Sequence, residues 1–211
     1  MIVTVDGPGG TGKSTVSRVV AHKAGLPHLD TGAFYRAATL AVLEAGVDPT
    51  DLTGVLDVVS ETRLAQESGR MYLNGRDVST EIRGEAVTGW VSAVAAHPGV
   101  RKRLVDMQRV WAESHSGGVV EGRDIGSVVF PDATVKVFLD ASPEVRARRR
   151  SLETGEAMDD VLDDLNRRDR HDSTREASPL MIPPGAVVVD TSELTFDEVV
   201  DEVLRLISAK S

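Results

Sequence analysis

The hydrophobic pattern at the amino terminus predicts a buried strand followed by an amphipathic helix. Ile2–Asp6 is almost wholly apolar and lacks the alternation of a half-exposed strand, which is typical of a parallel strand covered on both faces. In Ser14–Ala24 the apolar side chains and the stem of Lys23 recur at helical spacing before Gly25 stops the helix. A glycine-rich turn separates the two elements, so the order is strand, loop, helix.

Further short apolar runs, bounded by Gly, Pro or Asp, alternate with amphipathic segments along the rest of the chain. The strand candidates are Leu26–Asp30, Val119–Glu121, Val135–Leu139 and Val187–Asp190, and Ala33–Ala45, closed by Gly46, is a second helix. This alternation predicts an α/β fold with an open, five-stranded parallel sheet and helices on both faces.

The last helix has the clearest signals at its start and along its buried face. Thr195 with Glu198 forms a capping box, which marks the first turn. Its apolar residues form one stripe, which we expect to face the core: Phe196, Val199, Val200, Val203, Leu204 and Ile207.

Two segments depart from the strand–helix alternation. The pattern of Thr62–Arg83 predicts short strands. Asn74-Gly75 is the expected turn of a hairpin between Arg70–Leu73 and Arg76–Val78. This segment therefore predicts an inserted antiparallel lobe. Arg146–Arg175 holds eight arginines and no lysine. Within it an Asp-rich stretch precedes an Arg-rich one, an order that also suits the dipole of a helix.

Composition narrows the class of protein. The 211 residues are 41% hydrophobic and 27% charged, which is ordinary for one soluble core with insertions. A net charge of −9 argues against bulk attraction to nucleic acid or to an anionic membrane, so any anion site must be local. The absence of cysteine excludes disulfides, thiolate nucleophiles and Cys-ligated zinc.

No targeting or membrane segment is evident in the sequence. The first residues are not those of a secretory signal. The longest stretch without Asp, Glu, Lys or Arg is Ala86–Val100, which contains Pro98 and is shorter than the roughly 20 apolar residues of a membrane span. We expect a cytoplasmic protein without membrane or nucleic-acid partners, and a monomer, because no apolar helix face is left over after the core is filled.

The glycine-rich turn fits the phosphate-binding pattern G-x-x-x-x-G-K-[ST] in the context that this pattern requires, between a strand and a helix. Backbone N–H groups there surround phosphate oxygens, and the helix N-terminus adds partial positive charge. Lys13 would reach the β- and γ-phosphates, and the Ser14 hydroxyl would bind Mg²⁺. The expected nucleotide-binding residues are Gly7, Pro8, Gly9, Gly10, Thr11, Gly12, Lys13, Ser14 and Thr15.

A nucleotide-operated switch protein shares this loop and is the rival class. Asp51–Gly54 fits D-x-x-G and Ser208–Lys210 fits S-A-K, both of which occur in such switches. No N-K-x-D follows to read guanine, and the two patterns lie in an apparent connector and at the carboxyl terminus. We therefore favour a kinase over a switch.

Candidate acceptor residues follow two other strands. Thr31 lies near the start of the second helix with Tyr35 and Arg36 one turn in, where a helix N-terminus and an arginine can hold a second phosphate. After the strand that ends at Glu121, Arg123 can meet phosphate and Asp124 offers two acceptor oxygens to an exocyclic amine. Glu121 could act on the metal through water or orient the loop.

The arginine-rich region supplies further candidates. Arg168, Asp172 and Arg175 stand at i, i+4 and i+7, so on one helix they share a face and could grip a sugar or base. The opposing stripe is expected to pack inward: Met158, Val161, Leu162 and Leu165. The segment that begins at Arg146 is short enough to close over phosphates, with Arg149 acting in catalysis and Arg150 binding the donor nucleotide.

Taken together, these motifs resemble those of the bacterial cytidylate kinases, a family of nucleoside monophosphate kinases, over essentially the whole chain. The matching segments are Asp6–Thr15, Leu29–Arg36, Val91–Pro98, Gly122–Ala133, Val135–Ala141 and Arg168–Leu180. Two departures are Gly9, where many relatives carry Ala or Ser, and Glu121, where some carry Asp. The five histidines show no metal-binding spacing, and we assign them no catalytic role.

The resemblance implies a P-loop kinase fold and the reaction of ATP with CMP or dCMP, with Mg²⁺, to give ADP and CDP or dCDP. It implies that Ser92, Arg101, Asp124 and Arg175 read cytosine, that Arg168 and Asp172 bind the sugar, and that Thr31, Tyr35, Arg36 and Arg123 surround the acceptor phosphate. We expect a core of residues 1–30, 84–145 and 172–211, a monophosphate-binding insertion at 31–83 and a lid at 146–166. Within kinases, a uridylate or shikimate-type enzyme is the runner-up, and the hairpin lobe argues against the second.

Overall fold

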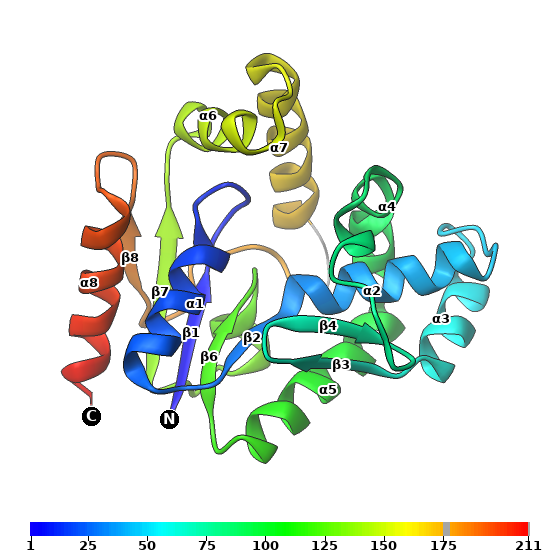
Figure 1. Cartoon of the computed structure of the whole chain (residues 1–211), viewed down its shortest axis with the longest axis horizontal. Helices are drawn as coiled ribbons and strands as arrows, with labels where there is room; N and C mark the ends of the chain where they lie inside the picture. The colour runs from blue at the N-terminus through cyan, green and yellow to red at the C-terminus, as the bar shows by residue number, and fades with distance from the viewer. Residues whose placement is uncertain (175–177, 211) are drawn as a thin grey trace. The chain divides into compact units, whose positions relative to one another are not determined.

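A computed structural model describes residues 1–174 and 178–210 of the chain (Figure 1). The chain forms two compact units, which are described in turn. Unit 1 comprises Met1–His28 and Ala112–Ser211, and unit 2 comprises Leu29–Trp111. Among the described residues, no helix is both long and apolar enough to cross a membrane.

The main sheet has five strands in the order β2-β6-β1-β7-β8. Their bounds are β1 Ile2–Asp6, β2 His28–Asp30, β6 Gly118–Glu121, β7 Val135–Asp140 and β8 Val187–Asp190. Strand β1 pairs in parallel with β6 and β7, and β7 pairs in parallel with β8. The predicted α/β fold with a five-stranded parallel sheet is therefore confirmed, including each predicted strand to within two residues.

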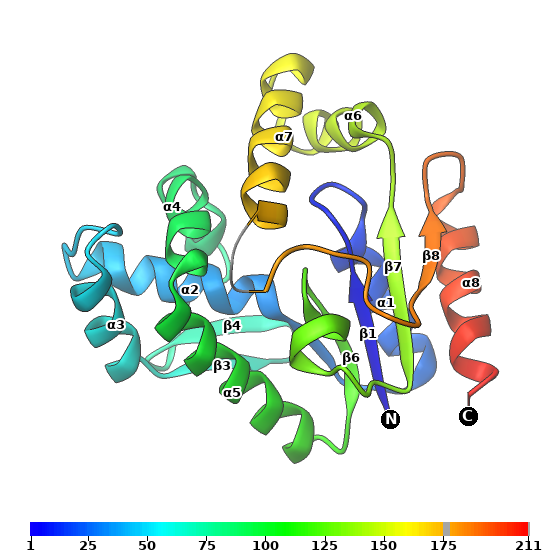
Figure 2. The ribbon, with the colours of Figure 1, turned by 180° about the vertical axis from the view of Figure 1, so that it is seen from behind.

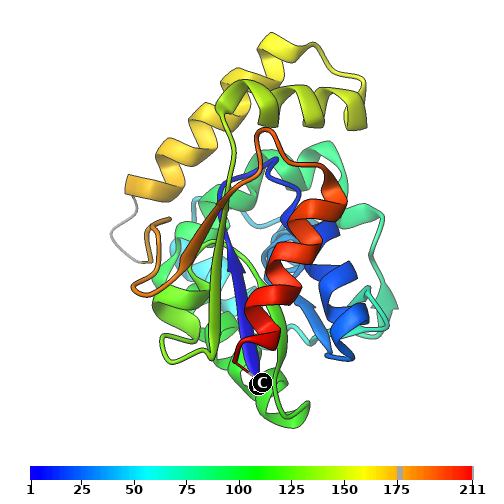
Figure 3. The ribbon, with the colours of Figure 1, turned by 90° about the vertical axis from the view of Figure 1, so that its left-hand side faces the viewer.

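Helices cover both faces of this sheet in unit 1. Helices α1 (Lys13–Ala24) and α8 (Phe196–Ser208) pack side by side on one face, and the π-helical turn η2 (Ile125–Val129) lies on the other (Figures 1 and 2). Helices α6 (Pro143–Thr154) and α7 (Met158–Thr174) pack against each other beyond the carboxyl end of β7, as the side view shows (Figure 3). The carboxyl ends of β1 and β7 thus point toward α6 and α7.

Valine dominates the core that holds the sheet and its helices together. The last four residues of β1 are all buried, as the unbroken apolar run predicts. The buried cluster joins β1 and β7 to the inner faces of α1 and α8, including Val16, Val20, Val199, Val200 and Val203. Burying a side chain of this size contributes about 1.5–3 kcal/mol, so this cluster anchors the strand that leads into the phosphate loop.

Unit 2 combines helices with a small antiparallel sheet. The helices are α2 Thr31–Glu44, α3 Leu52–Glu61, α4 Glu85–Ala96 and α5 Pro98–Ser114, with a 3-10 turn η1 at Glu81–Arg83. The sheet has the order β3-β4-β5 (Leu64–Glu67, Arg70–Leu73, Arg76–Asp77), with both pairs antiparallel, and β3 and β4 pack against α2. The predicted hairpin is confirmed: Asn74 and Gly75 have φ of 51° and 85°, the left-handed pair that such a two-residue turn requires.

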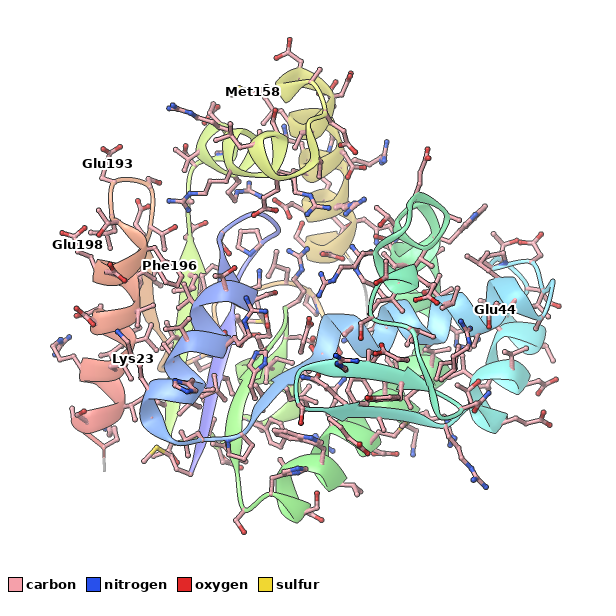
Figure 4. The ribbon with its side chains drawn as sticks, in the orientation of Figure 1. Lys23, Glu44, Met158, Glu193, Phe196 and Glu198 are labelled. Carbon is pink, nitrogen blue, oxygen red and sulfur yellow. The ribbon has the colours of Figure 1, made fainter. Side chains whose placement is uncertain are left out.

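Two expected core contacts are wrong, and they share one physical reason. Phe196 and Met158 are the first residues of α8 and α7, and their side chains are exposed (Figure 4). A helical side chain lies over the preceding turn, and at the first residue there is no such turn to pack beside.

The two units divide the chain differently from the expected core, insertion and lid. Residues 84–111 lie in unit 2, whereas we expected 84–145 to belong to the core. They group with unit 2 because α4 packs on α2 and η1. The functional assignment of these parts as core, monophosphate-binding insertion and lid stays a prediction.

Candidate active site

The glycine-rich loop between β1 and α1 passes very close to two other elements of unit 1. Gly7 has φ 146° and Gly10 has φ 79°. A Cβ atom on Gly7 would lie 2.1 Å from the carbonyl oxygen of Leu139, and one on Gly10 would lie 3.0 Å from the Cβ and carbonyl oxygen of Arg146. Only glycine allows this approach to β7 and α6. No side chain caps the N-terminus of α1, which leaves its first N–H groups available to an anion.

Lys13, the first residue of α1, curls back over this loop. Its Nζ donates to the carbonyl oxygen of Pro8 at 2.5 Å and to Thr11 Oγ1 at 3.4 Å. Enclosure of the ammonium group, followed by the nearby Arg123 guanidinium, lowers the pKa of Lys13 to about 7, although Glu121 acts in the opposite direction. A phosphate group in the loop would favour the charged form of this lysine.

Ser14 begins a chain of hydrogen bonds that crosses three elements. Its Oγ donates to Glu121 Oε2 at 2.7 Å, and the Nε2 atom of His28 lies 3.0 Å from Glu121 Oε1. Glu121 ends β6 and is 3% exposed, and His28 begins β2. The hydroxyl hydrogen of Ser14 is thus directed at Glu121, which leaves the oxygen lone pairs available to a cation.

Asp6, the last residue of β1, holds the segment that carries the predicted acceptor residues. Its two carboxylate oxygens accept from the backbone N–H groups of Ile125 and Gly126 at 2.7 and 2.8 Å. Burial raises the pKa of Asp6 to about 6, and these two hydrogen bonds counteract part of that rise. Asp124, the residue before this segment, is buried.

Arg123 joins the phosphate loop to α7. Its Nη1 donates to the carbonyl oxygen of Gly7 at 3.4 Å and lies 3.6 Å from Asp169 Oδ1, and its Nε lies 3.4 Å from Asp172 Oδ2. The structure therefore brings Arg123, predicted to bind the acceptor phosphate, to the loop and to Asp172, predicted to bind the sugar.

Arg146 is a buried link between the same elements. Its Nε donates to the carbonyl oxygen of Ala141 at 3.1 Å, and its Nη1 donates to the carbonyl oxygen of Gly9 at 3.1 Å and to Asp169. Only 5% of Arg146 is exposed. The guanidinium therefore links the start of α6 to both the phosphate loop and α7.

The other arginines predicted for the nucleotides have protein partners. Arg149 donates to Thr191 Oγ1 and to the Thr191 carbonyl oxygen at 2.9 and 2.6 Å, and Arg150 pairs with Glu153 along α6 at 3.2 Å. Arg168 pairs with Asp164, and burial lowers its pKa. Arg175, predicted to read cytosine, lies outside the described residues.

Unit 2 contains the remaining predicted acceptor residues. Thr31 opens α2 and is buried, and the half-buried Ser92 lies on α4. The guanidinium of Arg101 lies 5.3 Å from the centre of the Tyr35 ring and donates to the carbonyl oxygen of Ala95 at 3.1 Å. Arg36 donates to the carbonyl oxygen of Ile82 and to Thr88 Oγ1 at 3.2 and 2.8 Å. Thus Tyr35 and Arg101 form one contact, and Arg36 is directed at η1 and α4.

Sequence reasoning missed three residues of the site in unit 1. Asp6 could have been found, because a carboxylate at the end of a buried strand and directly before a phosphate loop needs partners of its own. His28 and Asp169 gave no such signal. Their partners Glu121 and Arg146 are 93 and 23 positions away in the sequence, so no local spacing predicts either contact.

Comparison with known proteins gives one family. The sequence model of cytidylate kinases matches residues 3–209. The chain is 51% identical over 216 residues to a cytidylate kinase of Mycobacterium leprae (strain Br4923), which covers 100% of this chain and 97% of that protein. It is 51% identical over 217 residues to a cytidylate kinase of Nocardia farcinica (strain IFM 10152). That match covers 99% of this chain and 94% of that protein.

Solved structures share the fold at low identity. A shikimate kinase from Acinetobacter baumannii, in complex with shikimate, is similar with a TM-score of 0.51 and 14% sequence identity. The match covers 98% of this chain and 92% of that one. At this identity the similarity shows a common P-loop kinase fold alone.

Proposed function

The chain belongs to the cytidylate kinase family, and from this premise we propose that it transfers the γ-phosphoryl group of ATP to CMP and dCMP, giving ADP and CDP or dCDP. The observation that carries the proposal is the loop after β1, where Gly7 and Gly10 take positive φ and Lys13 lies over the loop. Backbone N–H groups, a helix N-terminus and an ammonium group together suit a polyphosphate.

The donor nucleotide is proposed to bind along this loop, from Gly7 to Thr15. Lys13 would exchange its contact with the Pro8 carbonyl oxygen for oxygens of the β- and γ-phosphates. The phosphates would raise the pKa of Lys13 again, so the lysine would be fully charged when it neutralises the transferring group.

The residues around Ser14 fit a magnesium ion that is held largely by the nucleotide. Mg²⁺ prefers oxygen ligands and keeps water and phosphate oxygens in its shell, with one or two protein groups. Ser14 Oγ, supported by the buried carboxylate of Glu121, supplies such a group. Among the described residues, no group of three or more His, Asp or Glu side chains is placed to hold a metal ion. Bound Mg²⁺ would neutralise charge on the phosphates, and Ser14 would hold it in place.

Arginines are proposed to supply the remaining positive charge. Arg123 already lies against the loop, where it would bind the acceptor phosphate and the transferring group. Arg149 is proposed to act in catalysis and Arg150 to bind ATP. In that case their guanidinium groups would exchange Thr191 and Glu153 for phosphate oxygens.

Hydrogen bonding is proposed to select the acceptor. Asp124, together with Ser92, Arg101 and Arg175, would read the amino group and ring of cytosine, and Arg168 with Asp172 would bind the sugar. Thr31, Tyr35, Arg36 and Arg123 would surround the acceptor phosphate. The burial of Asp124 supports its part, because a buried acceptor facing the uracil carbonyl would be left without a donor.

The transfer itself is proposed to be direct and in line. An oxygen of the CMP phosphate attacks the γ-phosphorus of ATP while the bond to the β–γ bridging oxygen breaks, and no covalent enzyme intermediate forms. The acceptor phosphate is already largely ionised near pH 7, so no general base is required. Positioning of the two phosphate groups and neutralisation of their charge would therefore account for the rate acceleration.

The patterns shared with switch proteins have structural explanations in this chain. Asp51 of the D-x-x-G match is the N-cap of α3, where its side chain accepts from the N–H groups of Thr53 and Gly54 at 3.1 and 3.2 Å. The S-A-K match lies at the end of α8. The cytidylate kinase relatives do not favour the switch.

One assay tests the proposal against its alternatives. ADP release from ATP is measured with CMP, dCMP, UMP, AMP and shikimate as separate acceptors, with GTP hydrolysis measured alongside. We expect turnover with CMP and dCMP well above the other acceptors, and a requirement for Mg²⁺. Preference for UMP, AMP or shikimate would assign another kinase activity, and slow GTP turnover without acceptor phosphorylation would favour a switch.

A further inference from the structure

His28 contacts a carboxylate that is also hydrogen-bonded to Ser14, next to the phosphate loop. The two oxygens of Glu121 have partners on opposite sides: Ser14 Oγ at 2.7 Å on Oε2 and His28 Nε2 at 3.0 Å on Oε1. The His28 side chain is 15% exposed and that of Glu121 is 3% exposed. Glu121 is therefore almost fully buried and His28 largely so, whereas Ser14 is exposed to solvent.

The chemistry of the three groups fixes the direction of these hydrogen bonds. An ionised carboxylate can only accept, so His28 must carry its proton on Nε2 and the Ser14 hydroxyl must donate its only hydrogen. Glu121 has three rotatable side-chain bonds, so holding its carboxylate in one geometry costs conformational entropy. The rigid imidazole ring, fixed at the start of β2, removes the freedom of the carboxylate to rotate away from Ser14.

From this geometry, and resting on the proposed kinase function, we infer that His28 is a positioning residue for the magnesium-binding hydroxyl. By donating to Glu121 it holds the carboxylate that takes the hydrogen of Ser14 and turns the lone pairs of Ser14 Oγ outward. The predicted consequence is specific: His28 strengthens the binding of nucleotide with Mg²⁺ and leaves the binding of nucleotide alone unchanged. Outer partners of metal ligands typically contribute 10- to 100-fold, on the order expected here.

Two substitutions separate hydrogen bonding from shape. His28→Phe keeps a flat ring but removes the N–H donor. His28→Gln places an amide N–H at nearly the same reach, so it should restore the bond to Glu121. His22→Phe is the matched control, because His22 is an exposed histidine on α1 of the same unit. Thermal unfolding of each variant, monitored by far-UV circular dichroism, verifies that the variant is folded.

The experiment measures the Kd of the β,γ-imido analogue of ATP by titration calorimetry, once with saturating Mg²⁺ and once with EDTA. We expect Mg²⁺ to strengthen binding of the analogue by a similar factor in wild type, His28→Gln and His22→Phe. In His28→Phe this factor should be about 10-fold smaller, while the Kd in EDTA stays within about 2-fold of wild type. The midpoint Mg²⁺ concentration for CMP phosphorylation should rise for His28→Phe alone.

Two results would overturn the inference. An unchanged Mg²⁺ effect in His28→Phe would show that Glu121 needs no help from His28. An equal loss of affinity with Mg²⁺ and with EDTA, or no recovery in His28→Gln, would make His28 a packing residue only. Failure of the proposed function gives a different pattern, in which wild type itself does not bind the analogue or does not phosphorylate CMP.

Discussion

At the scale of single residues, the site is built from charged groups whose ionisation depends on their enclosure. Lys13 and Asp6 flank the phosphate loop, and burial moves their pKa values toward neutrality from opposite sides, to about 7 and about 6. Such perturbed groups cluster where a protein binds or transforms charged ligands. We expect two pH effects. Deprotonation of Lys13 should weaken nucleotide binding, and deprotonation of Asp6 should lower the stability of the fold.

The affinity for ATP should fall as pH rises above about 7. In the free protein Lys13 loses its proton near that pH, because its pKa is lowered to about 7, whereas bound phosphates favour the charged form. Between pH 7.5 and 9, where ATP is fully ionised, log Kd should rise by up to one per pH unit and binding should take up a proton. Calorimetry in buffers of different ionisation enthalpy measures both quantities. If Lys13→Ala shows the same pH dependence as wild type, the effect does not come from Lys13.

Asp6 should make the protein less stable as pH rises from about 4 to about 6. Its pKa is raised from 3.8 to about 6 on folding, so the folded state binds the proton more tightly, and stability is lost as that proton dissociates. A pKa shift of about two units corresponds to about 3 kcal/mol in the free energy of unfolding. Urea unfolding of wild type and Asp6→Asn at pH 4, 5, 6 and 7 isolates this contribution. A stability difference between the two proteins that stays constant with pH would contradict it.

Asp124→Asn should weaken the preference for CMP over UMP. An amide can turn its N–H toward the uracil carbonyl, whereas the buried carboxylate can only accept. Removing the mismatch of about 1–3 kcal/mol should reduce the ratio of kcat/KM for CMP and UMP by roughly 10- to 100-fold. Steady-state ADP release with both acceptors gives the ratio, with the exposed Asp132→Asn as control. A full wild-type ratio in Asp124→Asn would assign base recognition to another group.

At the scale of elements, signals within one strand, turn or helix predicted the structure well. The apolar run of β1, the Asn74-Gly75 turn and the capping box at Thr195 each formed as expected, because their causes lie within a few residues. Contacts between elements were not predictable in this way. For Arg146, for example, no local signal indicated its hydrogen bonds to the Gly9 carbonyl oxygen and to Asp169.

The capping box of α8 should be measurable as stability. The Thr195 side chain accepts from the Glu198 backbone N–H at 3.3 Å, and Glu198 Oε2 accepts from the Thr195 N–H at 2.8 Å. Thr195→Ala leaves first-turn N–H groups without a partner and should lower the free energy of unfolding by about 1 kcal/mol. Ser208→Ala, at the exposed end of the same helix, should change it by less than about 0.5 kcal/mol. Equal unfolding midpoints in urea for wild type and Thr195→Ala would show that the box contributes nothing.

At the scale of the whole molecule, an acidic chain places three basic side chains around one loop, where carboxylates of α7 pair with two of them. The net charge is −9, yet Lys13, Arg123 and Arg146 surround the loop after β1. The loop pattern and the arginine-rich region predicted this location from the sequence. The partners of each arginine could not be predicted, since Asp169 and Asp172 reach the loop only through the folding of α7 onto it.

The proposed donor and acceptor residues are distributed differently over the two units of the chain. The donor residues lie in unit 1, whereas the acceptor residues are divided between unit 1 and unit 2. In the sequence, unit 2 lies between two segments of unit 1, and it contains the hairpin that the Asn74-Gly75 turn predicted. The functional assignment of every acceptor residue stays a prediction. The sequence and the fold specify the backbone position of each residue but not which nucleotide atom its side chain contacts.

The central claim is that the loop after β1 holds ATP for transfer to CMP through Lys13. The most direct measurement is ADP release with saturating ATP and CMP for wild type, Lys13→Ala and Lys23→Ala, the last replacing an exposed lysine of the same helix that pairs with Asp201 (Figure 4). The account predicts that Lys13→Ala loses turnover by at least about 100-fold while keeping its unfolding transition, and that Lys23→Ala retains the wild-type rate. Near-normal turnover in folded Lys13→Ala would contradict it.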